Sequence, residues 1–323
     1  MTAESLAGNS GGPHPSLKRR GSRATIAADR AATVVLWGTG VFVLALLGSI
    51  IIHFAIAAWG VVSPSFILGD LGDGKTSVGG IFPILWNSIY MLVLTMLISI
   101  PLGIMAGIYM AEYAAENRVT TAIRFAEEAI SSVPSIVIGL FGLILFVDNF
   151  KMGYTTLFGA LSLTLFNLPL MARLSEQALR AVPQDERGAS LALGATKWQT
   201  IRHVVLPLAI PGLVTGIILT AGRVFGEAAV LLFTSGQGAP VHYDFGNLNV
   251  GAANWWQTSP WSPLRSTSTT LSVYIYTLRS EGLGAFVTQI VDGAAAILIS
   301  MVLIFNLGAR LIGRLLTRKL TAA

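Results

Sequence analysis

Residues 69–76 read GDLGDGKT, which fits the phosphate-loop pattern G-x-x-x-x-G-K-[ST] of nucleotide-hydrolysing proteins in full. That chemistry needs a strand before the loop and a helix after it, so that backbone N–H groups and a helix N-terminus surround the phosphates. Here the sequence SVGGIFP follows, and Asp70 and Asp73 would repel an anion. We therefore interpret the stretch as a glycine-rich turn and expect any ATP to be hydrolysed by another chain.

Two ionisable residues, Arg223 and Glu227, lie inside a long apolar run. A charge within the hydrocarbon of a membrane is energetically costly, and such residues are functional candidates for that reason. The two are four residues apart, which predicts a shared helix face, with Gly222 and Gly226 alongside for close helix packing. The planar guanidinium of arginine suits a forked contact with an oxyanion. A substrate path, in which Glu227 neutralises Arg223 when no anion is bound, and a purely structural ion pair both remain open.

The composition is that of an integral membrane protein. Hydrophobic residues make up 53% of the 323 residues, charged residues only 11%, and the mean hydropathy is +0.69. A soluble domain has about 25% charged residues. With no cysteine and four scattered histidines, the sequence predicts no disulfide and no metal site. The apolar runs contain no paired carboxylates and no Ser, His and Asp set, so we predict no catalytic residues, no cofactor and no enzymatic activity.

The apolar runs predict an all-α membrane protein with six transmembrane helices, because about 20 apolar residues are needed to cross the hydrocarbon as a helix. A short hairpin at about residues 148–153 must separate the third helix from the fourth. The six predicted spans are 33–58, 84–110, 129–147, 154–172, 208–234 and 286–309.

The basic residues predict the orientation. With the N-terminus in the cytoplasm, 16 of the 21 Lys and Arg residues fall on the cytoplasmic face, as the positive-inside rule expects. Both termini are then cytoplasmic, and GDLGDGKT lies outside, where there is no ATP. We predict a basic, disordered cytoplasmic tail over 1–32, a transmembrane permease domain over 33–312, and a basic cytoplasmic tail over 313–323. The net charge of +5 is attributed to this topology and to anionic lipid rather than to nucleic-acid binding.

The predicted cytoplasmic loop between the fourth and fifth spans has local signals for a helix-turn-helix. Pro183 breaks one helical stretch, residues 184–193 can form a second, and Gly194 can end it. Thr196 and Gln199 then form a capping-box signature that opens a third helix. Small and apolar side chains would be exposed on it, which fits either a docking surface for a partner or a helix lying on lipid headgroups.

The stretch GASLALGATKWQTIRHVVLP in this loop resembles the EAA loop of ABC-importer permeases. Gly194 matches the central glycine of that pattern, and Val204, Leu206 and Pro207 match its end. The acidic first position is Gly188 here, with Glu186 two residues earlier. The resemblance implies that an EAA-like coupling loop over 180–207 contacts an ATPase. The residues it implicates are Glu186, Gly188, Ala189, Ser190, Gly194, Ala195 and Trp198.

Further stretches are similar to PstA-type permeases, the permease subunits of phosphate-specific ABC importers. They are AGIYMAEYA (106–114), SSVPSIVIGLFGLILFV (131–147), LTLFNLPLMAR (163–173), AGRVFGEAAVLLFTSG (221–236) and LSVYIY (271–276). The resemblance implies a type I ABC importer permease in the bacterial cytoplasmic membrane, with Arg223 and Glu227 in its transport-associated R-x-x-x-E. The implied partners are a PstC-like permease, a PstB-like ATPase dimer and a periplasmic or lipid-anchored phosphate-binding protein.

Two further alternatives concern the substrate and the energy source. One Arg cannot distinguish phosphate from another oxyanion, and a secondary transporter driven by an ion gradient would have internal repeats, of which the sequence contains no convincing example. The external segment 235–284 is rich in Trp and Tyr. It fits either an aromatic belt at the membrane interface or a lid that meets a binding protein.

Overall fold

The computed structural model describes residues 23–69, 71, 77–151, 153–237, 262–282 and 284–321. The chain divides into two compact units, Met1–Ile52 and His53–Ala323. The first is dominated by the apolar helix α1 (Arg23–Ala57), which begins inside the range 1–32 that we expected to be a tail. Residues 1–22 of that expected tail lie outside the described residues.

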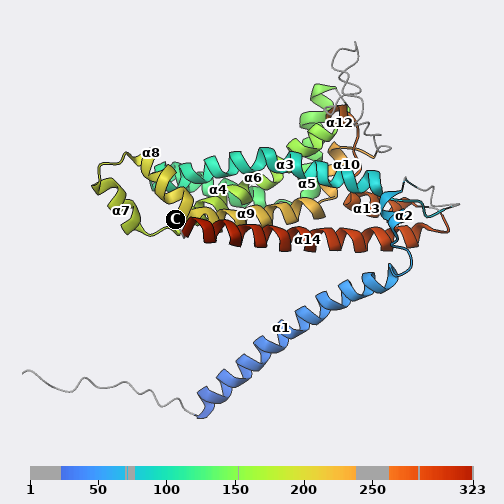
Figure 1. Ribbon diagram of the computed structural model, residues 1–323, viewed down its shortest axis with the longest axis horizontal. Helices are drawn as coiled ribbons and strands as arrows, with labels where there is room; N and C mark the ends of the chain where they lie inside the picture. The colour runs from blue at the N-terminus through green and yellow to red at the C-terminus, as the bar shows by residue number, and fades with distance from the viewer. Residues whose placement is uncertain are drawn as a thin grey trace, which may run out of the picture. The chain divides into compact units, whose positions relative to one another are not determined.

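The second unit is built on four long helices that lie side by side (Figure 1). They are α3 (Phe82–Ile108), α6 (Thr156–Arg180), α9 (Leu206–Gly226) and α14 (Val287–Thr321). At one end of this bundle lie α7 (Gln184–Ala192) and α8 (Lys197–Thr200). Towards the other end lie the short helices α2 (Pro64–Leu68), α10 (Ala229–Thr234), α12 (Ser262–Arg265) and α13 (Leu271–Glu281). Helix α14 extends through most of the predicted C-terminal tail, to Thr321.

Helices α3 and α6 pack unusually closely because α3 has glycine where they meet. A Cβ on Gly103 would overlap Met171, and a Cβ on Gly107 would overlap Ser175. The two contacts advance by four residues in the same direction along both helices, so α3 and α6 run parallel. Glycine pairs of this kind let helix backbones approach within a membrane, where hydrophobic exclusion does not drive helices together.

Five described helices are long and apolar enough to cross a membrane. The predicted third span, 129–147, is not one continuous helix. Helix α4 (Arg118–Ser132) and the segment formed by α5 (Ser135–Gly142) and the π-helical turn η2 (Leu143–Asp148) are bent by 99° at Val133 and Pro134. Proline has no N–H to continue the ladder and disfavours helical geometry in the residue before it. The number of spans is six if this bent pair counts as one.

The segment around GDLGDGKT does not have the setting of a phosphate loop. Helix α2 ends at Leu68, directly before the motif, where a phosphate loop would need a strand. Leu71 forms isolated bridges with Gly79 and Gly80. Residues 70 and 72–76 of the motif lie outside the described residues.

A hydroxyl-rich strap, residues 266–270, joins α12 to α13 through the interior. The carbonyl of Ser266 accepts a hydrogen bond from the Thr156 hydroxyl at 2.9 Å, and the carbonyl of Ser268 accepts one from Ser235 at the same distance. Because backbone polar groups cannot be left without partners in a membrane, these side chains allow an extended segment to be buried there. Residues 238–261 of the segment 235–284, which we expected to be external, lie outside the described residues, and so do its three tryptophans.

The α3–α6 contact gives a direct stability test. Gly107→Ala would place a methyl group against Ser175 and 2.9 Å from the backbone nitrogen of Glu176. The helices would have to separate, so we expect a loss of about 1–3 kcal/mol. Thermal unfolding of the purified protein in detergent measures this. Gly308→Ala is the matched control, since nothing lies within 4 Å of a Cβ there. Equal melting temperatures for the two variants would contradict the close packing.

Candidate functional site

Arg223 lies in the last turn of α9, and its guanidinium carbon is 3.7 Å from the centroid of the Phe166 ring. Phe166 belongs to α6 and is buried. A guanidinium over an aromatic face is attracted by the ring quadrupole, and the attraction grows when water is excluded. Because the ring has no oxygen acceptor, this contact does not itself pair the N–H donors of the guanidinium with a carboxylate or a carbonyl. Among the described residues, none accepts a hydrogen bond from Arg223.

Glu227 is not on the same helix face as Arg223, so that prediction is wrong. Helix α9 ends at Gly226, and Glu227 has an extended backbone with φ −78° and ψ 121°. Its Oε1 accepts a hydrogen bond from the backbone N–H of Val230 at 3.2 Å, which caps the short helix α10. Its carbonyl accepts one from the Ser272 hydroxyl at 2.8 Å. The predicted fifth span, 208–234, is therefore two helices, and the described ion pairs do not include one between Arg223 and Glu227.

The predicted helix-turn-helix is confirmed by α7 and α8. Pro183 precedes α7, Gly194 adopts a φ of +86° after it, and Thr196 and Gln199 form both hydrogen bonds of the capping box before α8. Gly194 is required there because a left-handed conformation costs other residues free energy. The hydroxyls of Ser190 and Thr200 lie 2.9 Å apart and join the two arms.

The residues predicted to contact an ATPase lie together on α7, α8 and the turn between them. Ser190 and Ala195 are half-buried. The other five are exposed: Glu186, Gly188, Ala189, Gly194 and Trp198. Leu193, which was not predicted, is 90% exposed in the turn.

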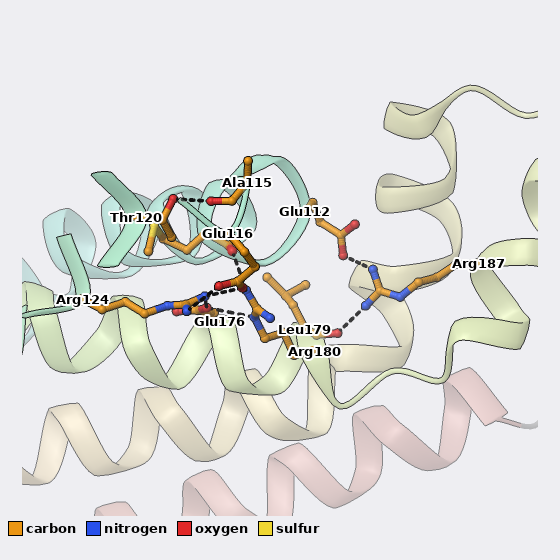
Figure 2. Close-up of polar contacts among 10 residues, drawn as sticks. Glu112, Ala115, Glu116, Thr120, Arg124, Glu176, Leu179, Arg180 and Arg187 are labelled. Carbon is orange, nitrogen blue, oxygen red and sulfur yellow. Dashed lines mark hydrogen bonds and ion pairs between the residues drawn. The ribbon is translucent and has the colours of Figure 1, made fainter. Parts of the chain in front are cut away.

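One acidic residue of the bundle, Glu112, holds both arms of the helix-turn-helix. It lies in the π-helical turn η1 (Tyr109–Tyr113) that continues α3. Its carboxylate pairs with Arg187 of α7, as Figure 2 shows, and its backbone carbonyl accepts a hydrogen bond from Lys197 of α8. The Lys197 ammonium also lies 4.8 Å from the centroid of the Tyr113 ring.

We call the contacts of Glu112 with Arg187 and Lys197 the clamp. A second charge cluster lies beside the clamp and joins α4 to α6 (Figure 2). Glu176 accepts hydrogen bonds from Arg124 at 3.0 Å and Arg180 at 2.9 Å, and Glu116 pairs with the same two arginines. The hydrogen bond and the positive charge of Arg124, followed by Arg180, hold the pKa of Glu116 below its usual value. Because the Glu116 side chain is 70% exposed, solvent screens this pairing strongly.

The family model for the "binding-protein-dependent transport system inner membrane component" matches residues 103–322. The chain belongs to this family. It is therefore a permease subunit of an ABC importer and an integral membrane protein, and the alternative of an ion-gradient-driven transporter is not supported. The matched region contains all the residues of the coupling and Arg223 sites described above.

Relatives of this permease subunit agree with that assignment. YqgI of Bacillus subtilis, a probable ABC transporter permease protein, is 44% identical over 295 residues, covering 91% of this chain and 98% of the relative. The phosphate transport system permease protein PstA 1 of Mycobacterium tuberculosis H37Rv is 34% identical over 244 residues, covering 75% of this chain and 72% of the relative.

A solved structure establishes the likeness of the fold. A chain of a bacterial alginate ABC transporter, in complex with an alginate pentasaccharide-bound periplasmic protein, matches with a TM-score of 0.62. It is 15% identical, and the match covers 90% of this chain and 96% of that chain. The predicted fold class, that of a type I ABC importer permease, is confirmed.

Sequence reasoning about this permease missed Glu112, Arg187 and Lys197 as site residues. Glu112 lies just beyond the predicted span 84–110, so it lacks the signal of Arg223, which is a charge inside an apolar run. Arg187 and Lys197 were considered only as basic residues of the cytoplasmic face. Phe166 carried no signal, because one more aromatic side chain in an apolar run is not distinctive.

The geometry of α7 and α8 can be tested by a disulfide. The chain has no cysteine, so Ser190→Cys with Thr200→Cys introduces a single pair, and hydroxyls 2.9 Å apart place the thiols within reach of each other. Trypsin cleaves after Lys197, between the two positions, so a disulfide keeps the two peptides joined in mass spectrometry. We expect rapid cross-linking on mild oxidation. The control pair, Ser190→Cys with the exposed Trp198→Cys, should react slowly, and equal rates would contradict the arrangement.

Proposed function

We propose that this chain is the permease subunit of an ATP-driven importer of inorganic phosphate in the bacterial cytoplasmic membrane. In this proposal it pairs with a PstC-like permease, docks a PstB-like ATPase dimer, and receives phosphate from a periplasmic or lipid-anchored phosphate-binding protein. The observation that carries the substrate assignment is Arg223, whose guanidinium lies over Phe166 at the end of a spanning helix. The identity to a phosphate permease of Mycobacterium tuberculosis supports it.

Arg223 has the chemistry to receive a phosphate oxyanion. Its planar N–H donors match a tetrahedral oxyanion in a forked geometry, which an ammonium group does not. The contact with Phe166 holds the guanidinium in place, so that less conformational freedom is lost when the anion binds. A neutral aromatic face attracts the cation without a competing carboxylate in direct contact. Phosphate can therefore bind a positioned cation and can also be released from it.

Glu227 acts in this proposal through its position and its charge. It lies between the end of α9 at Gly226 and the start of α10, where its carboxylate accepts the hydrogen bond of the Val230 N–H. It follows Arg223 by four residues, and the described ion pairs do not join the two side chains. We assign it partial neutralisation of Arg223 when no phosphate is bound, so that an isolated positive charge does not face the membrane interior.

We place the ATPase contact on α7, α8 and the turn between them. The side chains of Leu193 and Trp198 are 90% and 56% exposed, respectively, and the exposed basic residues Lys197 and Arg202 lie near them in the sequence. An apolar centre with a charged rim is typical of a protein interface. The excess of basic residues supports a cytoplasmic position for this end and for both termini.

The substrate is tested by uptake of radiolabelled phosphate in cells that lack the native chain. With this chain we expect ATP-dependent uptake that excess sulfate does not inhibit. Arg223→Gln should lower uptake by about tenfold or more, because a desolvated charged contact is lost. Arg223→Lys, which keeps the charge and loses the fork, should fall between the two.

The controls of the uptake experiment separate its outcomes. Membrane levels of each variant are measured by immunoblot, and the exposed substitution Arg279→Gln on α13 is the charge-matched control. Inhibition by sulfate would indicate another oxyanion specificity. Normal uptake by Arg223→Gln would assign Arg223 to structure and contradict the proposed path.

The ATPase contact is tested by Leu193→Asp. We expect the ATPase to be lost from the purified complex by about tenfold, since a buried apolar contact at an interface centre is worth one to a few kcal/mol. Gln184→Asp adds the same charge at the exposed first residue of α7 and should retain the ATPase. Retention of the ATPase by both variants would place the contact elsewhere.

A further inference from the structure

Glu112 joins a membrane-spanning helix to both coupling helices through two different groups. Its carboxylate binds Arg187 of α7 and its backbone carbonyl binds Lys197 of α8. In the described part of the chain, every hydrogen bond and ion pair from η1 to α7 or α8 involves Glu112. These segments are also joined by the contact of the Lys197 ammonium with the Tyr113 ring.

The Glu112–Arg187 pair of this clamp is buried on both sides, whereas in the neighbouring cluster the buried Glu176 pairs with arginines that are 36% and 44% exposed. The side chains of Glu112 and Arg187 are 9% and 11% exposed, whereas Glu116 is 70% exposed. The other amino group of Arg187 donates to the carbonyl of Leu179, at 2.6 Å, near the end of α6. Two directional contacts on a buried guanidinium fix its position, because neither can be replaced by water without rearrangement.

The clamp also lies on a physical route to Arg223. Helix α3, which η1 continues, is in backbone contact with α6 at Gly103 and Gly107. Helix α6 carries Phe166, the side chain beneath Arg223. Closely packed helices move together because their interface cannot be compressed. A movement of α7 that pulls on Glu112 therefore reaches the helix pair that supports the substrate contact.

We propose that Glu112 is a positioning residue that transmits movement of the coupling helices to α3 and α6, and so couples ATP hydrolysis to transport. The proposal rests on the proposed function, since it needs an ATPase docked on α7 and α8. It assigns the transmission to the non-covalent contact between Glu112 and Arg187, which lie 75 residues apart in the sequence. This contact acts in addition to the short covalent links from α7 to α6 and from α8 to α9.

The test compares Glu112→Gln with Glu116→Gln in the complete transporter, reconstituted in vesicles with its binding protein. ATP hydrolysis and phosphate uptake are measured on the same sample. For Glu112→Gln we expect hydrolysis to continue while phosphate carried per ATP falls about fivefold or more, the lower end of typical coupling between sites. Glu116→Gln, which changes a neighbouring carboxylate that does not reach α7, should keep the wild-type ratio. An unchanged ratio in Glu112→Gln overturns the proposal.

Two further variants separate transmission from folding. Glu112→Leu with Arg187→Met removes both charges together and so avoids an unpaired buried charge. Its thermal unfolding should stay near the wild type while its transport per ATP falls as in Glu112→Gln. Glu112→Cys with Arg187→Cys, in this cysteine-free chain and with cysteine-free partners, should regain coupling when a short bis-methanethiosulfonate cross-linker joins the two thiols through disulfides, and lose it on reduction. Full coupling without the cross-linker overturns the proposal.

A substrate-independent measurement keeps the two proposals distinguishable. A cysteine at Gly222, next to Arg223, is labelled with an aqueous maleimide in the presence and absence of ATP. In the Glu112→Gln background we expect the ATP-dependent change in labelling to disappear. Wild-type complexes that show this change but carry no phosphate would refute the substrate assignment alone. A change that persists in Glu112→Gln would refute the clamp alone.

Discussion

Gly103 and Gly107 allow the backbones of α3 and α6 to meet along one face, and the rest of the bundle follows from that contact. The two helices run parallel, so the chain between them has to return across the bundle, and it does so through the bent pair α4 and α5. The same contact brings η1 to the end of α6, where Glu112 meets Arg187. Along the helices it also sets the depth of Phe166, on which Arg223 rests.

The polar contacts of the bundle differ in how much they contribute to the free energy of folding, according to their burial. Removing one partner of a buried ion pair typically costs about 3–5 kcal/mol, since the other charge is left without compensation. An exposed pair is typically worth about 0–1 kcal/mol. Glu112 and Arg187 belong to the first kind and Glu116 with Arg124 to the second. Loss of one partner of the Glu112–Arg187 pair is therefore expected to cost more free energy than loss of one partner of the Glu116–Arg124 pair.

The break between α9 and α10 illustrates how a membrane protein accommodates irregular backbone. Helix α10 is short, and its first N–H groups need acceptors in a region where water does not supply them. Glu227 provides one acceptor through its carboxylate, and Ser272 binds the Glu227 carbonyl. The hydrogen bonds that satisfy the backbone in this break therefore also fix the position of the end of α9, which carries Arg223.

The sequence by itself determined the features that depend on composition and on neighbouring residues. Apolar length predicted the membrane helices, and Pro183, Gly194 and the Thr196–Gln199 capping box predicted α7 and α8, because each of these signals acts within a few residues. Only the tertiary structure decided the 99° bend at Pro134, since a proline in an apolar run can either kink a helix or end it. It also decided that Glu227 caps α10 instead of facing Arg223 along one helix. The Glu112–Arg187 pair spans 75 residues of sequence, and the packing of α3 on α6 brings its two ends together, so no local pattern could reveal it.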